Sequence, residues 1–279
     1  MGRTLDTRWH RTDAGLWRRR IRRETAIYSG ALACDVWIPD APNQPALIVL
    51  HGGAWNASPW DRSTPAVWGA VATSFAERGL GVINADFTAA IDGTRQDPID
   101  DVLALVSWVR TNAATYNLDA TRVAVLGISS GGHAALMAGS TGVAGTTRPD
   151  AIVSWSGVPD LVASHAIVPD NIERYMDGLT LPTDQAEYEA YSPVDAMTAN
   201  CCPLRLVGSD DEESDVGSEG PNVEQYTDLE TAALAASVSV TTRIFSGQVH
   251  GIFDGVTVDA GVVAPNDIPA AYQWIVDTI

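Results

Sequence analysis

Lysine is absent from this chain. Its 279 residues hold 17 basic side chains, all of them arginine, against 35 acidic ones, so the formal net charge is −18 at pH 7. Such an acidic chain repels the phosphate backbone of nucleic acids, and we expect no nucleic-acid partner. Two explanations of the composition stay open. One is adaptation to high salt, where screening relieves self-repulsion, and the other is codon bias in a GC-rich genome.

Long apolar runs and cysteines are also scarce. No apolar run approaches the ~18 residues that a membrane-spanning helix needs, so we expect no membrane partner. Of the three cysteines, Cys201 and Cys202 are adjacent, and Cys34 stands alone. This number and spacing provide neither a disulfide framework nor a zinc site. We expect Cys34 to be a small buried apolar residue.

Residues 1–24 form an Arg-rich N-terminal arm. Residues 1–23 hold eight arginines and two aspartates, which leaves nine arginines against 33 acidic residues in the rest of the chain. The cluster Arg18–Arg23 is similar to a twin-arginine export signal, but the apolar segment that such a signal needs does not follow. We therefore expect an arm or edge strand that pairs with the acidic body, and a cytoplasmic protein.

Residues 25–279 are expected to form a single α/β domain. The chain is 46% hydrophobic, which is enough for one large core. Apolar strand-like runs alternate with Ala-rich helical stretches, and this alternation predicts a mostly parallel sheet covered by helices on both faces. The clearest predicted strands are residues 46–50, 123–126, 151–155, 203–208 and 241–245.

A Gly-x-Ser-x-Gly pentapeptide at Gly127–Gly131 provides the candidate nucleophile. The predicted strand 123–126 enters it, and a helical pattern of small residues leaves it. A strand, this pentapeptide and a helix together are typical of a nucleophile elbow, a sharp turn that holds a serine exposed and strained. Its glycines avoid collisions with the neighbouring strand and helix. Ser129 is therefore the predicted nucleophile.

A second glycine motif, His51–Trp55, follows the predicted strand 46–50. In lipases and esterases a His-Gly-Gly segment supplies half of the oxyanion hole, and the amide after the nucleophile supplies the other half. Glycines suit this role because the backbone amides themselves face the developing negative charge. We predict an oxyanion hole from the amides of Gly52, Gly53 and Ser130, with Ala54 as an alternative to Gly52.

The remaining catalytic residues are expected in the order acid, then histidine. His250 follows the predicted strand 241–245 and is the only histidine after the acidic loop, so it is the predicted base. Asp211 is the preferred acid because it stands three residues after the glycine that ends a strand. Its neighbour Asp210 is the second choice, and Asp215 belongs to an acidic run that is otherwise a solvated loop. Asp160 is an outside alternative.

Apolar residues beside these motifs are the candidate substrate-binding residues. They are Trp55, Phe87, Ile128, Trp155, Ile252 and Phe253. Trp55 and Ile128 are favoured because the motifs fix them beside the nucleophile. Such walls suit short acyl chains or aromatic acyl groups rather than charged substrates, and the negative surface disfavours anionic ones. We expect His133 to be a packed helix residue.

These motifs together resemble the small α/β-hydrolase esterases, a group that includes hormone-sensitive-lipase-like esterases, feruloyl and acetyl-xylan esterase-like proteins, and kynurenine formamidases. Further segments that match this group are residues 35–39, 97–102, 108–110, 117–123, 156–161 and 191–193. The resemblance covers residues 25–279 and implies an α/β-hydrolase fold. Only 50 residues precede His51, which implies a minimal cap domain or none.

Two departures from that group bear on the substrate. Ile128 and Ser130 flank the nucleophile where the group often has an acidic residue or histidine before it and alanine after it. Ser130 still offers its backbone amide to an oxyanion. Phe87 and Thr88 stand where a Tyr-Arg pair is common.

The motifs and the resemblance predict a serine carboxylesterase that hydrolyses short-chain or aryl carboxylic esters through an acyl-enzyme intermediate. Its expected partner is a small-molecule ester, its expected state is a monomer or homodimer, and it needs no metal or organic cofactor. One alternative is an amidase-type hydrolase such as an aryl formamidase. Another is a non-catalytic α/β-hydrolase scaffold, which the intact set Ser129, Asp211 and His250 disfavours.

Overall fold

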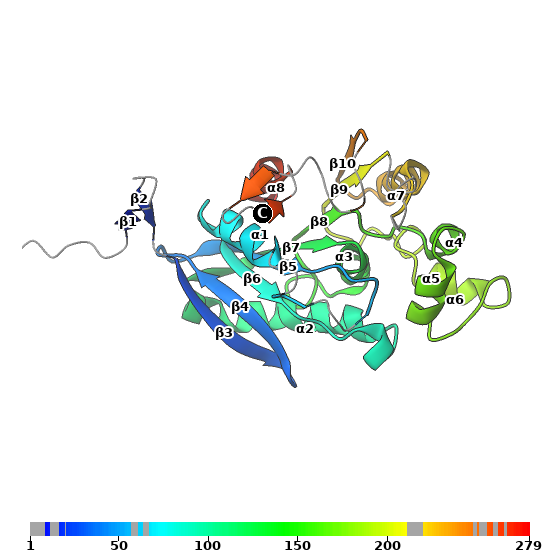
Figure 1. Cartoon of the computed structure of the whole chain (residues 1–279), viewed down its shortest axis with the longest axis horizontal. Helices are drawn as coiled ribbons and strands as arrows, with labels where there is room; N and C mark the ends of the chain where they lie inside the picture. The colour runs from blue at the N-terminus through cyan, green and yellow to red at the C-terminus, as the bar shows by residue number, and fades with distance from the viewer. Residues whose placement is uncertain are drawn as a thin grey trace, which may run out of the picture.

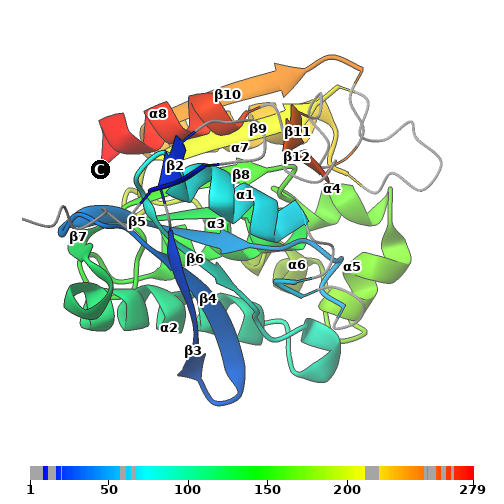
Figure 2. The same cartoon turned by 60° about the vertical axis from the view of Figure 1, so that its left-hand side comes forward.

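The computed structural model describes residues 9–11, 17–19, 21–56, 61–63, 67–210, 220–247, 250, 256–258, 262–264 and 267–279. Its main element is an eight-stranded sheet (Figures 1 and 2). In spatial order the strands are β10 (Val240–Phe245), β9 (Leu204–Ser209), β8 (Ala151–Trp155), β7 (Leu118–Ile128), β5 (Gln44–Leu50), β6 (Gly81–Ala85), β4 (Leu32–Ile38) and β3 (Arg22–Ser29).

The six strands from β10 to β6 run parallel, and β4 and β3 continue the sheet as an antiparallel pair. The mostly parallel sheet that the alternation of apolar and Ala-rich stretches predicts is confirmed. Because carboxyl ends of parallel strands meet at one edge, the segments that follow β5 and β7 lie side by side. These are the segments that carry the two glycine motifs.

Helices cover both faces of this sheet (Figure 2). The helices α2 (Asp97–Asn112), α3 (Ser130–Thr141) and α7 (Val223–Ala235) pack on one face. The helices α1 (Val67–Ala76) and α8 (Ile268–Thr278) pack on the other. Two separate apolar cores result, one on each side of the sheet.

Strand β5 shows why the central strands have continuous apolar sequences. Ile48 and Leu50 point into the core beneath α2 and α3, whereas Leu47 and Val49 point into the core beneath α1 and α8. Alternate side chains of a strand face opposite sides, so a strand covered on both faces needs apolar residues throughout.

The connection from β8 to β9 carries a small cap of three short helices. These are α4 (Leu161–His165), α5 (Pro169–Tyr175) and α6 (Gln185–Ala190), which lie together at one end of the molecule (Figure 1). Their buried residues, among them Tyr175 and Tyr188, form a third apolar cluster that also includes Trp55. The insertion lies between β8 and β9, not in the segment before His51 from whose length a minimal cap or none is predicted.

The N-terminal arm meets the sheet at its edge. β3 begins at Arg22, inside the predicted arm, and Arg23 donates a hydrogen bond of 2.6 Å to the Asp35 carboxylate of β4. Ahead of it, β1 (Trp9–Arg11) and β2 (Trp17–Arg19) pair as an antiparallel hairpin. The remaining elements are β11 (Val256–Val258), β12 (Val262–Ala264) and the short 3-10 helices η1 (Ala90–Asp92) and η2 (Ala113–Tyr116).

A buried charge cluster joins α8 to the sheet. Asp267, which directly precedes α8, is fully buried. Its carboxylate accepts hydrogen bonds from two nitrogens of Arg205 on β9, from Trp155 Nε1 at 3.1 Å and from Arg243 Nη1 at 3.4 Å. Because a buried carboxylate is costly unless it is paired, these partners are what permit Asp267 to sit inside the domain.

Candidate active site

Ser129 lies in the sharp turn between β7 and α3. Its φ of 52° and ψ of −121° fall in a region that side-chain-bearing residues rarely adopt. Two backbone hydrogen bonds hold the turn. Ser129 N donates to the Trp155 carbonyl at 2.9 Å, and the Ser129 carbonyl accepts from His133 N at 2.9 Å. The turn therefore has the strained strand-to-helix geometry of a nucleophile elbow.

The glycines of the pentapeptide are required by close backbone approaches. A Cβ atom on Gly127 would collide with the carbonyl of Gly131. One on Gly131 would collide with the carbonyl of His51 and lie 3.0 Å from that of Leu50. The first turn of α3 is thereby packed directly against the end of β5.

His250 lies beside the predicted nucleophile. Its Nε2 atom is 2.9 Å from Ser129 Oγ. When the ring carries its proton on Nδ1, Nε2 accepts the hydrogen bond of the serine hydroxyl. These two residues are 121 positions apart in the chain. The fold thus brings together the two residues for which the sequence predicts nucleophile and base.

The predicted acid Asp211 lies outside the described residues, as do Asp215, Ile252 and Phe253. The alternative Asp210 is exposed and accepts hydrogen bonds from Gly247 N at 2.6 Å and Ser246 Oγ at 2.8 Å. The backbone bond from Gly247, followed by that from Ser246, lowers the pKa of this carboxyl. Asp210 therefore ties the end of β9 to the turn after β10.

The other alternative acid, Asp160, is the N-cap of α4. Its carboxylate accepts hydrogen bonds from Val162 N at 2.8 Å and Ala163 N at 3.0 Å. A side-chain oxygen in this position satisfies the free amides at the start of a helix. The contacts of Asp160 are those of a structural cap.

The loop after β5 passes directly over Ser129. A Cβ atom on Gly52 would lie 3.1 Å from the Ser129 Cβ. Gly53, Ala54 and Trp55 follow with φ angles of 141°, 51° and 56°. Three successive positive φ angles turn the chain sharply after β5.

His51 orients this loop. Its ring stacks on Phe87 at a centroid distance of 4.6 Å, and its Nδ1 atom lies 2.8 Å from the Gly52 carbonyl. Burial lowers the pKa of His51, an effect that the hydrogen bond to Gly52 partly offsets. A neutral ring with Nδ1 protonated donates to that carbonyl. In a trans peptide the carbonyl and the next amide point in opposite directions, so the Gly53 N–H points away from the imidazole.

Of the predicted pocket residues, Trp55 and Ile128 lie next to the loop after β5, whereas Trp155 lies in the domain core. Trp55 stacks on Tyr175 of the cap at 4.5 Å. Ile128 is buried, with its Cγ2 atom near Gly52. Trp155 is fully buried in the core beneath α1 and α8, where it hydrogen-bonds Asp267. Trp55 thus links the loop after β5 to the cap, while Trp155 is part of the domain core.

A cavity of about 310 Å³ opens beside the loop. Its apolar and aromatic walls include Trp55, Phe87 and His51, and Gly52 and Ser130 border it on the side of Ser129, the predicted nucleophile. Polar residues complete the lining: Asn56, Asp61, Asp86, Thr88 and Asp92. The three carboxylates carry no signal in the sequence, because each stands singly in a loop that only the fold brings together with the others.

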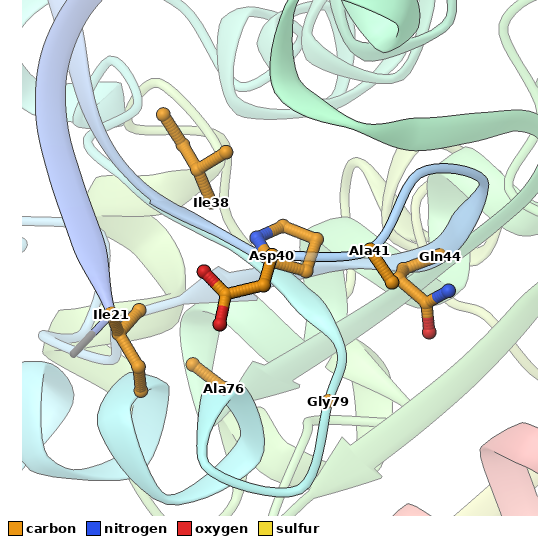
Figure 3. Close-up of a pocket in the computed structure, with 8 residues that line it drawn as sticks. Ile21, Ile38, Asp40, Ala41, Gln44, Ala76 and Gly79 are labelled. Carbon is orange, nitrogen blue, oxygen red and sulfur yellow. The ribbon is translucent and has the colours of Figure 1, made fainter. Parts of the chain in front are cut away.

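A second cavity is much smaller and lies elsewhere. It has a volume of about 50 Å³ and is lined by residues such as Ile21, Asp40 and Ala76 (Figure 3). Gln44 also lines it, so it lies at the amino end of β5, the opposite end from His51. A space of this size holds one or two water molecules, so it is no substrate site.

The cap is fastened to the loop that borders the larger cavity. Arg95 forms ion pairs with Asp177, in the linker from α5 to α6, at 2.7 Å and with Glu187 of α6 at 2.9 Å. The Tyr175 hydroxyl donates to the Arg95 carbonyl at 3.0 Å. These contacts hold the aromatic stack of Trp55 and Tyr175 in a fixed position.

Neither a metal centre nor a membrane helix is found in the described segments. They contain no group of three or more His, Cys, Asp or Glu side chains arranged to hold a metal ion. Of the helices in the same segments, none is both long enough and apolar enough to pass through a bilayer.

His133, four residues after Ser129, is a packed helix residue, as the sequence indicates. It is fully buried, its Nε2 atom is 2.9 Å from the Tyr191 carbonyl, and its ring meets the edges of Trp55 and Tyr175. Burial lowers the pKa of His133 to about 4, although the hydrogen bond to Tyr191 opposes that shift. The ring is therefore neutral at pH 7.

This neutral histidine makes stability depend on pH. In the unfolded chain His133 takes up a proton as the pH falls below its ordinary pKa of 6.5, whereas in the folded chain it stays neutral down to about pH 4. The free energy of unfolding therefore decreases as the pH falls from about 6.5 to about 4. The shift corresponds to about 3 kcal/mol. In urea unfolding between pH 7.5 and 4, the variant His133→Gln, which keeps a donor for Tyr191, is expected to lose less stability than the wild type. If the free energy of unfolding of the wild type and of His133→Gln fell equally with pH, His133 would not be the cause of the pH dependence.

Solved structures share this architecture. A carbohydrate esterase from gut microbiota, solved as a truncated form, aligns with a TM-score of 0.73 at 19% identity, over 88% of this chain and 90% of that one. Esterase 2 of Thermogutta terrifontis, phosphoramylated by tabun, aligns with a TM-score of 0.69 at 18% identity, over 91% and 94%. At this level of identity the likeness shows the fold. The protein is an α/β hydrolase by architecture, as the resemblance implies.

Residues 34–216, more than half of the chain, match the sequence model of BD-FAE. The chain belongs to this family of α/β-hydrolase esterases. Esterase LipC of Mycobacterium tuberculosis is 29% identical over 210 residues, which cover 68% of this chain and 51% of LipC. Carboxylesterase NlhH of the same species is 33% identical over 118 residues, 41% of this chain and 36% of NlhH. The chain thus spans about half the length of LipC and less of NlhH.

Proposed function

We propose that the protein is a serine carboxylesterase that hydrolyses short-chain or aryl carboxylic esters. The observation that carries this proposal is the 2.9 Å contact between His250 Nε2 and the hydroxyl of Ser129, which stands in a strained turn. The membership of the chain in BD-FAE and its similarity to LipC and NlhH support an ester as the substrate class.

The first half of the reaction forms an acyl-enzyme. His250 Nε2 takes the proton of the Ser129 hydroxyl as Oγ attacks the ester carbonyl carbon. The amides of Gly52, Gly53 and Ser130 receive the oxyanion of the tetrahedral intermediate. Ser130 is the first residue of α3, so the helix dipole adds to this stabilisation. The imidazolium then protonates the leaving alcohol as its C–O bond breaks.

The second half releases the acid. A water molecule gives a proton to His250 and attacks the acyl carbon, and the Ser129 oxygen leaves with that proton. In both halves Asp211 is the proposed partner of His250, which would hold the ring in its reactive tautomer and stabilise its charged form. No step of this cycle needs a metal or an organic cofactor.

The test is hydrolysis of p-nitrophenyl acetate, butyrate and octanoate beside p-nitroacetanilide, in low salt and in molar salt. We expect the esters to be cleaved and kcat/KM to rise from acetate to butyrate, because each methylene buried against the aromatic wall contributes up to about 0.8 kcal/mol. We expect the anilide to be cleaved far more slowly.

Two outcomes would overturn this proposal. Faster cleavage of the anilide than of any ester would favour the amidase-type hydrolase. Folded protein that cleaves none of the four compounds in either salt would favour a non-catalytic scaffold. Circular dichroism of the same samples establishes that the protein is folded.

A further inference from the structure

Two adjacent cysteines meet beside the C-terminal part of α3. Cys201 and Cys202 stand in the connection from α6 to β9, directly before Pro203. A Cβ atom on Gly139 of α3 would lie 3.4 Å from Cys201 Sγ and 3.5 Å from Cys202 Sγ. Side chains of neighbouring residues in an extended chain point to opposite sides, whereas these two sulfurs converge on one point. The turn therefore places both thiols on the same side of the chain.

Hydrogen bonds fasten this turn to the end of α3. Cys201 N donates to the Thr198 carbonyl at 2.9 Å. Asn200 Nδ2 donates to the carbonyls of Ser140 at 3.2 Å and Gly142 at 2.9 Å. The convergence of the two thiols is therefore a fixed feature of the fold.

The two thiols differ in exposure and in acidity. Cys201 is 8% exposed, whereas Cys202 is 1% exposed. A hydrogen bond that the Cys202 thiol donates to the Cys201 sulfur lowers the pKa of Cys201, and burial opposes this effect. The same contact, together with burial, raises the pKa of Cys202. Cys201 is thus the group that ionises first, and Cys202 keeps its proton.

Two further groups stabilise a negative charge on Cys201. Ser140 is 6% exposed, and in the described part of the chain its Oγ makes no hydrogen bond to oxygen or nitrogen. Its hydroxyl faces Cys201 and lowers the pKa of that thiol, as does the positive charge of Arg148. Arg148 Nη1 donates to Asn200 Oδ1 at 3.2 Å, which holds the guanidinium beside the turn. A thiolate next to hydrogen-bond donors and a cation is typical of reactive cysteines.

We propose that Cys201 and Cys202 form a peroxide-reactive dithiol that closes reversibly to a disulfide. This modification site does not depend on the proposed ester hydrolysis, because it lies away from the elbow. Gly139 is about 15 Å along α3 from Ser129. The two cysteines precede the amino end of β9, and the predicted catalytic acid follows its carboxyl end.

The oxidant is a hydroperoxide, for which hydrogen peroxide is the simplest case. The Cys201 thiolate attacks one peroxide oxygen, and the O–O bond breaks to leave a sulfenic acid on Cys201 and a hydroxide ion. The Cys202 sulfur then attacks the sulfenic sulfur, and the hydroxyl group leaves as water with the Cys202 proton. Two thiols thus lose two hydrogen atoms, and the peroxide becomes two water molecules.

The disulfide is expected to be easily reduced. Adjacent Cα atoms are about 3.8 Å apart, whereas ordinary disulfides join Cα atoms roughly 4.4–6.8 Å apart. The ring that links two adjacent cysteines is therefore strained, and strain makes a disulfide more oxidising. Closure also keeps Cys201 at an oxidation state that a thiol reverses, because it consumes the sulfenic acid before a second peroxide can attack.

The test treats the folded wild type with hydrogen peroxide at mildly alkaline pH and follows its peptides by mass spectrometry. We expect the peptide that holds Cys201 and Cys202 to lose the mass of two hydrogen atoms and to regain it with dithiothreitol. Cys34 is the internal control, because it is fully buried, and burial, followed by the charge of Asp35, raises its pKa to about 12. It is expected to stay reduced.

Variants assign a role to each thiol. Cys202→Ser is expected to leave a sulfenic acid on Cys201, which dimedone traps. Cys201→Ser removes the more acidic thiol, so oxidation of the remaining Cys202 is expected to be at least about tenfold slower. Arg148→Gln is expected to slow disulfide formation about threefold. Its matched control is Arg78→Gln, which removes an exposed charge just after α1, on the other face of the sheet, and is expected to react as the wild type does.

Three outcomes would overturn the proposal. The first is a peptide of unchanged mass in peroxide-treated protein that circular dichroism shows to be folded. The second is oxidation of Cys34 as fast as that of Cys201. The third is a disulfide that joins two chains, which a non-reducing gel detects. Turnover of p-nitrophenyl butyrate by the same samples tests the esterase function separately, and we expect the oxidised and reduced proteins to differ by less than about twofold.

Discussion

Replacement of Ser129 by alanine is expected to lower kcat for p-nitrophenyl butyrate by about 10⁴- to 10⁶-fold. The substitution removes the hydroxyl that lies 2.9 Å from His250 Nε2, and with it the proposed acyl-enzyme route. What remains is attack by water within a cavity that still orients the ester. The measurement is steady-state release of p-nitrophenol, with background hydrolysis subtracted.

The matched control for this variant is Ser107→Ala on α2, which removes a hydroxyl from a helix away from the elbow. It is expected to retain wild-type kcat. Mass spectrometry with an organophosphate ester gives a second readout, since the wild type gains one phosphoryl adduct and Ser129→Ala gains none. Residual activity above a tenth of the wild type would show that another residue attacks the ester.

Replacement of Asp267 by asparagine is expected to lower the free energy of unfolding by about 3–5 kcal/mol. The carboxylate is fully buried and accepts from Arg205, whose side chain is 10% exposed, and from Trp155 Nε1. Asparagine keeps the shape but removes the negative charge, so the buried guanidinium of Arg205 loses its counter-ion. Urea denaturation at pH 7 measures the change.

Asp277→Asn, near the end of α8, is the control for this effect. Asp277 accepts a single hydrogen bond from Gln273 on the surface, so its substitution is expected to change stability by less than about 0.5 kcal/mol. The double variant Asp267→Leu with Arg205→Met removes both charges, and it is expected to recover part of the loss. If Asp267→Asn and the double variant lowered the free energy of unfolding equally, the unpaired charge of Arg205 would not be the cause of the loss.

The parts of the fold that the sequence predicts are those encoded by neighbouring residues. The apolar runs 46–50, 123–126 and 151–155 are all inside β5, β7 and β8, because a strand buried on both faces must be apolar throughout. The elbow was also predictable. A side chain at position 127 or 131 would collide with neighbouring backbone atoms, so the turn into α3 requires glycine at both positions.

The parts that the sequence does not predict depend on residues far apart in the chain. Asp61 and Asp92 carry no local signal, and only the packing of their loops places both on the cavity that Ser130 also lines. Likewise Trp155 is a pocket candidate in the sequence because it is an apolar residue beside the motifs, but its indole hydrogen-bonds Asp267, 112 residues later, in the domain core. The choice of Asp211 as the acid stays a prediction.

The order of the strands also has a consequence for how the chain is made. β7, β8, β9 and β10 follow one another outward from β5, so the sheet grows at one edge in the order of synthesis. The face of the sheet under α1 is completed much later in synthesis. It is also covered by α8, which follows α1 by about 200 residues. Trp68, Val71 and Phe75 of α1 therefore remain incompletely covered until residues 268–278 exist. Nascent chains that stop earlier expose an apolar surface of the kind that leads to aggregation.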